Sequence, residues 1–217
     1  MGKDFICILG IDGSGKSTLA ERLKKKYIQN NIEYRYIWGG CHHYISFPFV
    51  AIGKRIFLKK TNQFENYNNY HEKIKETSKN SLILTLYENM IIFDYFLQIL
   101  FKIQLPLLFG QGVITDRYVY GTVIDMAANF GYTEEKRNNM INKTLKYFPK
   151  PEYTFFIDVP EDIAYSRKDD IPSIEYLKLR RSQYLSLING HNIILLDGLK
   201  DSEELEKIVF ETIAFRC

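Results

Sequence analysis

The 217-residue sequence predicts one α/β domain with a parallel β-sheet. Short continuous apolar runs, of the kind buried on both faces of a parallel sheet, recur along the chain. Helical patterns separate these runs, and the first run ends in a glycine-rich turn that precedes a helix. No internal repeat, low-complexity tract or linker divides the sequence, so we expect a single domain over residues 1–217.

Five segments have the pattern of strands. They are residues 4–10, 33–38, 112–116, 153–159 and 192–197. The second segment alternates between apolar and polar residues, which predicts a strand at an edge of the sheet. Because helical patterns lie between the segments, we expect parallel strands joined by right-handed crossovers.

The first helix is predicted from Leu19, Leu23 and Tyr27, which recur every four residues. Residues 46–60 also have a helical pattern. Residues 61–73 are rich in asparagine and predict a loop.

The most apolar region is residues 82–109. A membrane helix needs about 20 mostly apolar residues, but Glu88, Asp94 and Lys102 interrupt this region and Pro106 breaks it. We therefore predict a long buried helix that also packs against a partner subunit, and no membrane association.

The composition is ordinary for a soluble protein, with 46% hydrophobic and 25% charged residues. The net charge of +3 is small and the basic residues are scattered, with residues 24–26 predicted to be a solvated helix face, so we expect no nucleic-acid partner. The odd, widely spaced set Cys7, Cys41 and Cys217 favours a reducing compartment. The chain enters its first strand directly, without a signal peptide pattern, and we expect a cytoplasmic protein.

The triplet at residues 41–43 combines Cys41, His42 and His43, which raises the question of a metal site. Adjacent residues rarely converge on one ion, and no second ligand pair follows at a useful spacing. A polar loop is the favoured interpretation.

The glycine-rich turn, GIDGSGKSTL at residues 10–19, matches the pattern G-x-x-x-x-G-K-[ST] between a strand and a helix. Its glycines let backbone N–H groups point inward, where they and the helix N-terminus attract phosphate oxygens. Lys16 can reach the β- and γ-phosphates of ATP, and the Ser17 hydroxyl can hold Mg²⁺. The residues expected to bind this cofactor are Asp12, Gly13, Ser14, Gly15, Lys16, Ser17 and Thr18.

Asp12 is an unusual residue in such a turn, because a carboxylate beside bound triphosphate costs electrostatic energy. It could accept a hydrogen bond from a sugar hydroxyl of the phosphate acceptor. The alternative is a local role in stabilising the turn.

A second group of candidate residues follows the third strand, which ends in TDRY. Ligands of open α/β sheets bind beyond the carboxyl ends of strands, so Asp116, Arg117 and Tyr118 are expected at the substrate site. Asp116 could hold Mg²⁺ through water or orient the acceptor, and Arg117 could bind an acceptor phosphate with its planar fork. A structural salt bridge is the alternative for this pair.

A third candidate segment is DVPEDIAYSRKDDIPS at residues 158–173. Arg167 and Lys168 end its short helix, and residues 167–173 could form a mobile lid that closes over the transferring phosphoryl group. Alternatively, these positive charges only complement the helix dipole.

The segments GIDGSGKST, GVITDRY, DVPEDIAYSRK and YLKLRRSQYLSL, in this order, resemble the thymidylate kinase family of P-loop nucleoside monophosphate kinases. The resemblance covers nearly the whole chain. It implies a three-layer fold with a five-stranded parallel sheet in the order 2-3-1-4-5, a short lid and a homodimer. It also implies transfer of the γ-phosphoryl group of ATP to dTMP with Mg²⁺.

The resemblance assigns roles to individual residues. Lys16 and Ser17 take the ATP and metal roles, and Asp12 lies near the 3′-hydroxyl of the acceptor. Arg117 contacts the acceptor phosphate, and Arg167 begins the lid. Catalytic residues are thus expected to be Lys16, Arg117 and Arg167.

The sequence departs from the family pattern mainly on the acceptor side. Trp38-Gly39-Gly40-Cys41-His42-His43 replaces an Arg-Glu-Pro-Gly-Gly type segment, and Gly13 stands where some members have an arginine. Asp94-Tyr95 replaces an Asp-Arg pair that faces the acceptor, so Asp94 is kept as a substrate-binding candidate. Gly121, Asp125 and Met126 replace a serine and a Tyr-Gln pair near the base. Whether His42 or His43 replaces the missing arginine stays open.

Three functions are compatible with these patterns. No N-K-x-D motif indicates a GTPase switch, and TDRY lacks the glutamate of an ATPase motor, so transfer to an acceptor is favoured. The leading expectation is an ATP-dependent nucleoside monophosphate kinase that converts dTMP to dTDP. The alternatives are a kinase of the same fold acting on a nucleoside or another small molecule, and a non-catalytic ATP-binding protein.

Overall fold

The computed structural model describes residues 4–42, 44, 46–48, 51, 67–78 and 81–214. Its five strands form one parallel sheet in the order β2-β3-β1-β4-β5, as predicted. The strands are β1 (Phe5–Gly10), β2 (Tyr34–Trp38), β3 (Gly112–Asp116), β4 (Tyr153–Asp158) and β5 (Ile194–Asp197). The predicted edge position of the second strand is confirmed.

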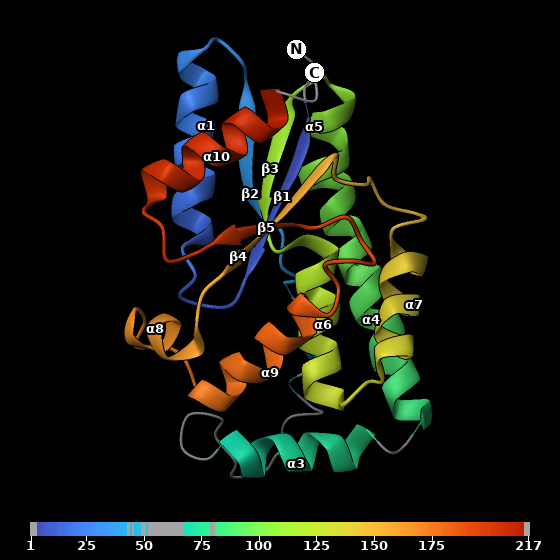
Figure 1. The fold of residues 1–217 in the computed structure, drawn as a ribbon. Coiled ribbons are helices and arrows are strands. Elements are labelled where there is room, and N and C mark those ends of the chain that lie inside the picture. The colour runs from blue at the N-terminus through green and yellow to red at the C-terminus, as the bar shows by residue number, and fades with distance from the viewer. Residues whose placement is uncertain are drawn as a thin grey trace.

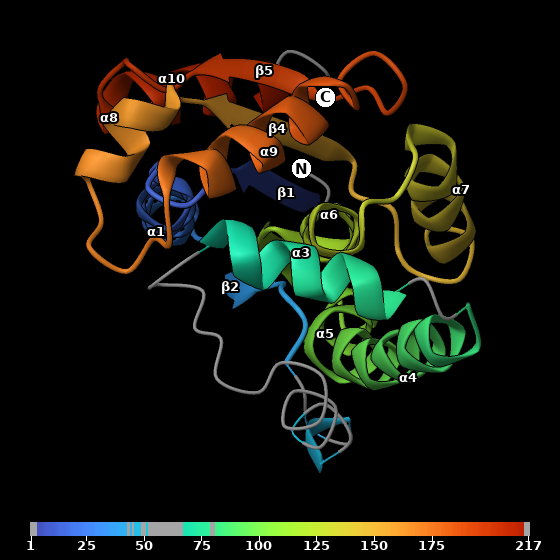
Figure 2. The same cartoon turned by 90° about the horizontal axis from the view of Figure 1, so that it is seen from below.

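Helices surround the sheet (Figure 1). They are α1 (Lys16–Gln29), α3 (Tyr67–Ser78), α4 (Ser81–Ile99), the π-helix η1 (Leu100–Gln104), α5 (Leu105–Leu108), α6 (Tyr118–Phe130), α7 (Glu134–Thr144), α8 (Glu161–Ser166), α9 (Ile174–Leu185) and α10 (Ser202–Ala214). The helices α1 and α10 pack together, and α6 and α5 contact β1 and β3 from the other side. The view from below shows α3 crossing beneath α6, with α9 alongside (Figure 2).

The apolar runs form strands because the central sheet is buried on both faces. Every residue of β1 and β3 is buried, as are the first five of β4. The β1 run FICILG therefore needs no polar alternation. The carboxyl ends of the strands point toward the side of the molecule where α3, α8 and α9 gather (Figure 1).

The predicted loop at residues 61–73 is wrong from Tyr67 onward, where α3 begins. Asparagine lowers helix propensity, but packing against α6 overrides that preference. One contact is the ring nitrogen Nε2 of His71, which lies 2.6 Å from the carbonyl oxygen of Ala128. Most of the helix predicted over 46–60 lies outside the described residues.

The expected long helix at 82–109 is present, but two of its predicted features need correction. Pro106 does not break it, because the wider turn of η1 precedes α5 and Pro106 lies at the start of that helix, where its missing N–H is tolerated. The helix is also only half buried. Its buried stripe is Ile91, Tyr95, Ile99 and Ile103, whereas Leu82, Leu86, Phe93, Phe96, Phe101 and Leu108 are exposed.

Residues 84–108 are long and apolar enough to cross a membrane by length and composition. Within their most apolar window, 39% of the residues are buried inside the protein. One side of this segment therefore belongs to the core, and the other presents an apolar surface.

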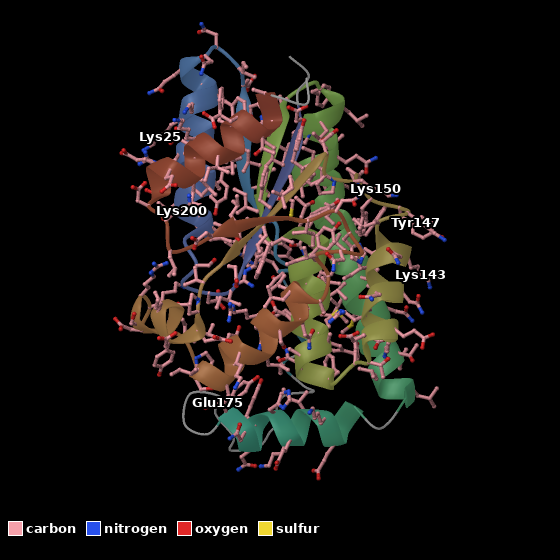
Figure 3. All side chains as sticks on the ribbon, in the orientation of Figure 1. Lys25, Lys143, Tyr147, Lys150, Glu175 and Lys200 are labelled. Atoms are coloured by element: carbon pink, nitrogen blue, oxygen red, sulfur yellow. The ribbon has the colours of Figure 1, made fainter. Side chains whose placement is uncertain are left out.

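Several labelled basic side chains lie apart on the outer surface (Figure 3). Lys25 lies on α1 and Lys200 precedes α10, whereas Lys143 and Lys150 lie on the opposite side of the molecule, near α7. These four lysines do not form a common basic surface.

We expect the substitution Phe156→Ala to lower the free energy of unfolding by about 3–5 kcal/mol, because it leaves a cavity in the core. Phe156 is 1% exposed and stacks on Tyr184 with a ring-centroid distance of 5.2 Å. Its neighbour in register on β5, Leu195, is 51% exposed and serves as the control. Leu195→Ala should change stability by no more than about 0.5 kcal/mol in urea unfolding. Equal losses from both variants would contradict this view of the core.

Candidate active site

The glycine-rich turn leads directly into α1, whose N-cap is Gly15 in the left-handed conformation with φ 89°. No side chain among the described residues caps this helix, so its first N–H groups are open to a ligand. The Ser14 hydroxyl is buried and lacks a hydrogen-bond partner in the described part of the chain. These unsatisfied donors fit a phosphate group.

The turn packs closely under α8. A Cβ atom on Gly13 would lie 2.1 Å from the carbonyl oxygen of Ala164, and Gly13 has φ 81°, so only glycine fits. Arg167, directly after α8, donates to the carbonyl oxygen of Gly13 at 3.5 Å. The structure thus brings the first residue of the predicted lid to the phosphate loop. An arginine at position 13 would have no room here.

Lys16 is 5% exposed, and its Nζ atom donates to the carbonyl oxygen of Ile11 at 2.8 Å. Burial lowers the pKa of Lys16 to about 8, and the charge of Arg117 acts in the same direction. The carboxylates of Asp116 and Asp12 oppose this shift. The negative charge of a bound polyphosphate would therefore raise the pKa of Lys16 and stabilise its protonated form.

Ser17 and Asp116 meet as expected for the predicted metal site. The Ser17 hydroxyl donates to Oδ2 of Asp116 at 2.8 Å, and Oδ1 of that buried carboxylate has no partner among the described residues. A hydroxyl and a carboxylate are the hard oxygen ligands that Mg²⁺ takes together with water and phosphate oxygens. The described residues contain no group of three or more His, Cys, Asp or Glu that could hold a metal alone. The site fits a metal that arrives with a nucleotide.

Arg117 lies in a strained turn between β3 and α6. Its φ is 84° and that of Tyr118 is 61°, both unusual for residues other than glycine. The N–H of Arg117 donates to the carbonyl oxygen of Ile8 on β1 at 2.9 Å. A Cβ atom on Gly121 would lie 2.6 Å from the Cβ of Arg117, so the glycine at this position makes room for the arginine.

The guanidinium of Arg117 lies between two carboxylates. It forms an ion pair with Asp12 of the glycine-rich turn, and its Nη1 atom lies 3.8 Å from Oδ2 of Asp125. Tyr176 of α9 also donates its hydroxyl to Asp12 at 3.3 Å. Burial works to raise the pKa of Asp12, but the charges of Arg117 and Lys16 outweigh it and hold that pKa below its ordinary value.

Arg180 completes this cluster and was not expected from the sequence. It is 3% exposed, and its Nε atom donates to Oδ1 of Asp125 at 2.7 Å. Its guanidinium lies 3.6 Å from the ring centre of Tyr176. A signal was present, because Arg180 shares the apolar face of its helix with Leu177 and Tyr184, and a buried charge there requires a partner.

Two predicted substrate residues lie outside this cluster. Tyr118 is fully buried and donates its hydroxyl to the carbonyl oxygen of Pro149 at 2.7 Å, so its side chain has no surface for an acceptor. Asp94 is 2% exposed and accepts from the backbone N–H groups of Tyr44 and Ser46, at 2.8 and 3.1 Å. Its contacts fix the segment after β2, and its role toward the acceptor stays a prediction.

Of the two histidines that could replace the missing arginine of the family pattern, the structure describes His42. His42 is exposed, its ring lies 4.4 Å from that of Trp38, and its backbone pairs with the side chain of Gln98. Within the described part of the chain, its contacts are with Trp38, Cys41, Tyr44 and Gln98 rather than with the cluster around Arg117. His43 lies outside the described residues.

The chain is similar to thymidylate kinases over nearly its whole length, although no family model matches it. It is 23% identical over 222 residues to a probable thymidylate kinase of Staphylothermus marinus, covering 97% of this chain and 96% of the relative. It is 28% identical to probable thymidylate kinase 1 of Saccharolobus solfataricus, covering 93% and 92% of the two chains. It is also 28% identical to a thymidylate kinase of Kosmotoga olearia, covering 95% and 94%.

We expect MgATP binding to take up protons near pH 8. A bound polyphosphate raises the pKa of Lys16 from about 8, so at pH 8 roughly half a proton is taken up per ATP, and affinity falls as the pH rises further. Titration calorimetry in two buffers of different ionisation enthalpy measures this uptake. The Lys16→Arg variant, whose guanidinium stays protonated, should show none. Equal heats in both buffers for the unaltered protein would contradict the shifted pKa.

Proposed function

We propose that this divergent thymidylate kinase-like protein is an ATP-dependent nucleoside monophosphate kinase. Its leading acceptor is dTMP, which it converts to dTDP. The full-length similarity to proteins named thymidylate kinases supports the assignment to phosphotransferases. We propose a cytoplasmic location, in line with Cys7 and Cys41, both of which are free thiols.

One contact carries this proposal, the ion pair between Asp12 and Arg117. Asp12 belongs to the phosphate loop, and Arg117 follows the neighbouring strand β3. An arginine at this point can hold a second phosphate group beside the one bound by Lys16. A hydrolase needs only water at this position, whereas transfer between two phosphate-bearing substrates needs two phosphate sites.

MgATP, when bound, supplies the phosphoryl group and divalent charge. The residues of the chain bind and orient the two substrates and stabilise the charge of the transferring phosphoryl group. Lys16 and the N–H groups at the start of α1 bind the β- and γ-phosphates, and Ser17 and Asp116 are the residues that would hold the metal. Arg117 holds the acceptor phosphate in place of one of its carboxylate partners. Arg167 adds positive charge where negative charge develops during transfer.

A first experiment measures ADP release with MgATP and the acceptors dTMP, dUMP, UMP, CMP and thymidine. We expect release to depend on a monophosphate and to fall by at least about 100-fold in Lys16→Ala, because a positive group at the transferring phosphate is lost. Arg117→Ala should mainly raise KM for the acceptor. Arg35→Ala, an exposed arginine on β2, is the control and should retain activity. Absence of release above the blank, with ATP binding intact, would contradict a nucleotide kinase.

We also propose a homodimer, formed through the exposed apolar side of α4, η1 and α5. This side carries Leu82, Leu86, Phe93, Phe101, Leu108 and Phe109, which are between 55% and 80% exposed. Large exposed apolar side chains gathered on one helical segment are typical of a protein interface. A second copy of the chain that packs on this side would remove these apolar side chains from water.

Light scattering after size exclusion tests this arrangement. The protein should have twice the mass of one chain, and Phe93→Asp with Phe101→Asp should give the single-chain mass, since a buried unpaired charge opposes association. Leu199→Asp replaces a residue that is 58% exposed after β5 and should leave the dimer intact. A single-chain mass for the unaltered protein would exclude the dimer at that concentration.

A further inference from the structure

Tyr36 of β2 has a hydroxyl group beside the candidate metal site and no role in the proposed transfer. Tyr34, two residues earlier, lies on the face of β2 that packs on α1, and its ring stacks on that of Tyr27 at a centroid distance of 4.0 Å. Side chains two residues apart on a strand share one face, so Tyr36 also faces α1. Because α1 begins after the end of β1 and returns toward the start of β2, Tyr36 lies nearer than Tyr34 to the first turn of the helix.

The hydroxyl of Tyr36 reaches the pair formed by Ser17 and Asp116. Burial raises the pKa of Tyr36, whereas a hydrogen bond with the Ser17 hydroxyl opposes this shift. The charges of Asp116 and Glu21 act in the same direction as burial. Tyr36 therefore keeps its proton at neutral pH and can donate it in a hydrogen bond.

The hydrogen-bonding capacity of Ser17 sets the direction of its bond with Tyr36. A serine hydroxyl has one proton and two acceptor lone pairs. The Ser17 proton is donated to Oδ2 of Asp116 at 2.8 Å, because an ionised carboxylate can only accept. Tyr36 must therefore donate its own proton to one lone pair of the Ser17 oxygen. The second lone pair stays available, as does Oδ1 of Asp116, which has no partner among the described residues.

We propose that Tyr36 is a positioning residue for the metal site, which fixes the Ser17 hydroxyl and leaves one lone pair of its oxygen for Mg²⁺. Without this bond, the Ser17 hydroxyl could turn among its staggered orientations. Side chains that orient a metal ligand in this way typically contribute about 10–100-fold to metal affinity. The inference rests on the proposed function, in which MgATP is the phosphoryl donor, and it does not depend on which acceptor is used.

Nucleotide binding with and without the metal tests this role. Titration calorimetry measures the Kd of a non-hydrolysable ATP analogue in Mg²⁺ and in EDTA, and the ratio of the two values gives the affinity gained from the metal. Tyr36→Phe keeps the ring and removes the hydroxyl. We expect this variant to lower the gain by about tenfold and to leave the Kd in EDTA unchanged. The Mg²⁺ concentration for half-maximal transfer should rise by a similar factor.

Tyr34→Phe is the matched control, because it removes a hydroxyl from the same face of the same strand. The Tyr34 hydroxyl accepts from the backbone N–H of Asp4 at 3.2 Å and donates to its carboxylate at 3.4 Å. The affinity gained from Mg²⁺ should therefore be unchanged in this variant. A double variant tests whether Tyr36 acts through Ser17. In a Ser17→Ala background, Tyr36→Phe should have no further effect, because the oxygen that it orients is absent.

The outcomes separate this role from packing and from the proposed function. An equal gain from Mg²⁺ in the unaltered protein and in Tyr36→Phe would overturn the role, and so would equal losses of affinity in Mg²⁺ and in EDTA, which would indicate packing alone. Absence of any gain in the unaltered protein would overturn it as well. Failure to phosphorylate any monophosphate, with the gain from Mg²⁺ intact and reduced in Tyr36→Phe, would refute the proposed kinase and still support the role of Tyr36.

Discussion

The ion pair between Asp12 and Arg117 is the interaction on which the arrangement of the site depends. It joins the loop after β1 to the turn after β3, and these loops meet only because the two strands are neighbours in the sheet. The strained backbone of Arg117 and the absence of a side chain at Gly121 direct the guanidinium into this contact. The sheet order thus determines that the loop after β1 and the turn after β3 face each other.

The site also holds a nearly balanced set of buried and partly buried charges. They are the cations Lys16, Arg117 and Arg180 and the carboxylates of Asp12, Asp116 and Asp125. A buried charge without a partner would cost several kcal/mol, and both arginines form ion pairs with these carboxylates.

The departures from the family pattern have a structural consequence on the acceptor side. Asp94 and Gln98 of α4 hold the backbone after β2, and α3 forms a cover over α6 through His71. Asp125 and Arg180 introduce an ion pair where the resemblance would place groups near the base. The glycine-rich loop therefore follows a common sequence pattern, whereas Asp94, Asp125 and Arg180 are placed by contacts between distant elements.

The sequence by itself determined the fold class, the five strands and the glycine-rich loop, and it predicted phosphate and metal chemistry for Lys16 and Ser17. These features follow from local patterns, because hydrophobic periodicity reports which face of an element is buried and glycine spacing reports a local backbone conformation. Only the tertiary structure decided that residues from Tyr67 onward form a helix, that the Tyr118 ring points into the core and that one side of α4 is exposed. It alone paired Arg180 with Asp125, 55 residues apart, because such a contact depends on how α6 and α9 pack rather than on either helix alone.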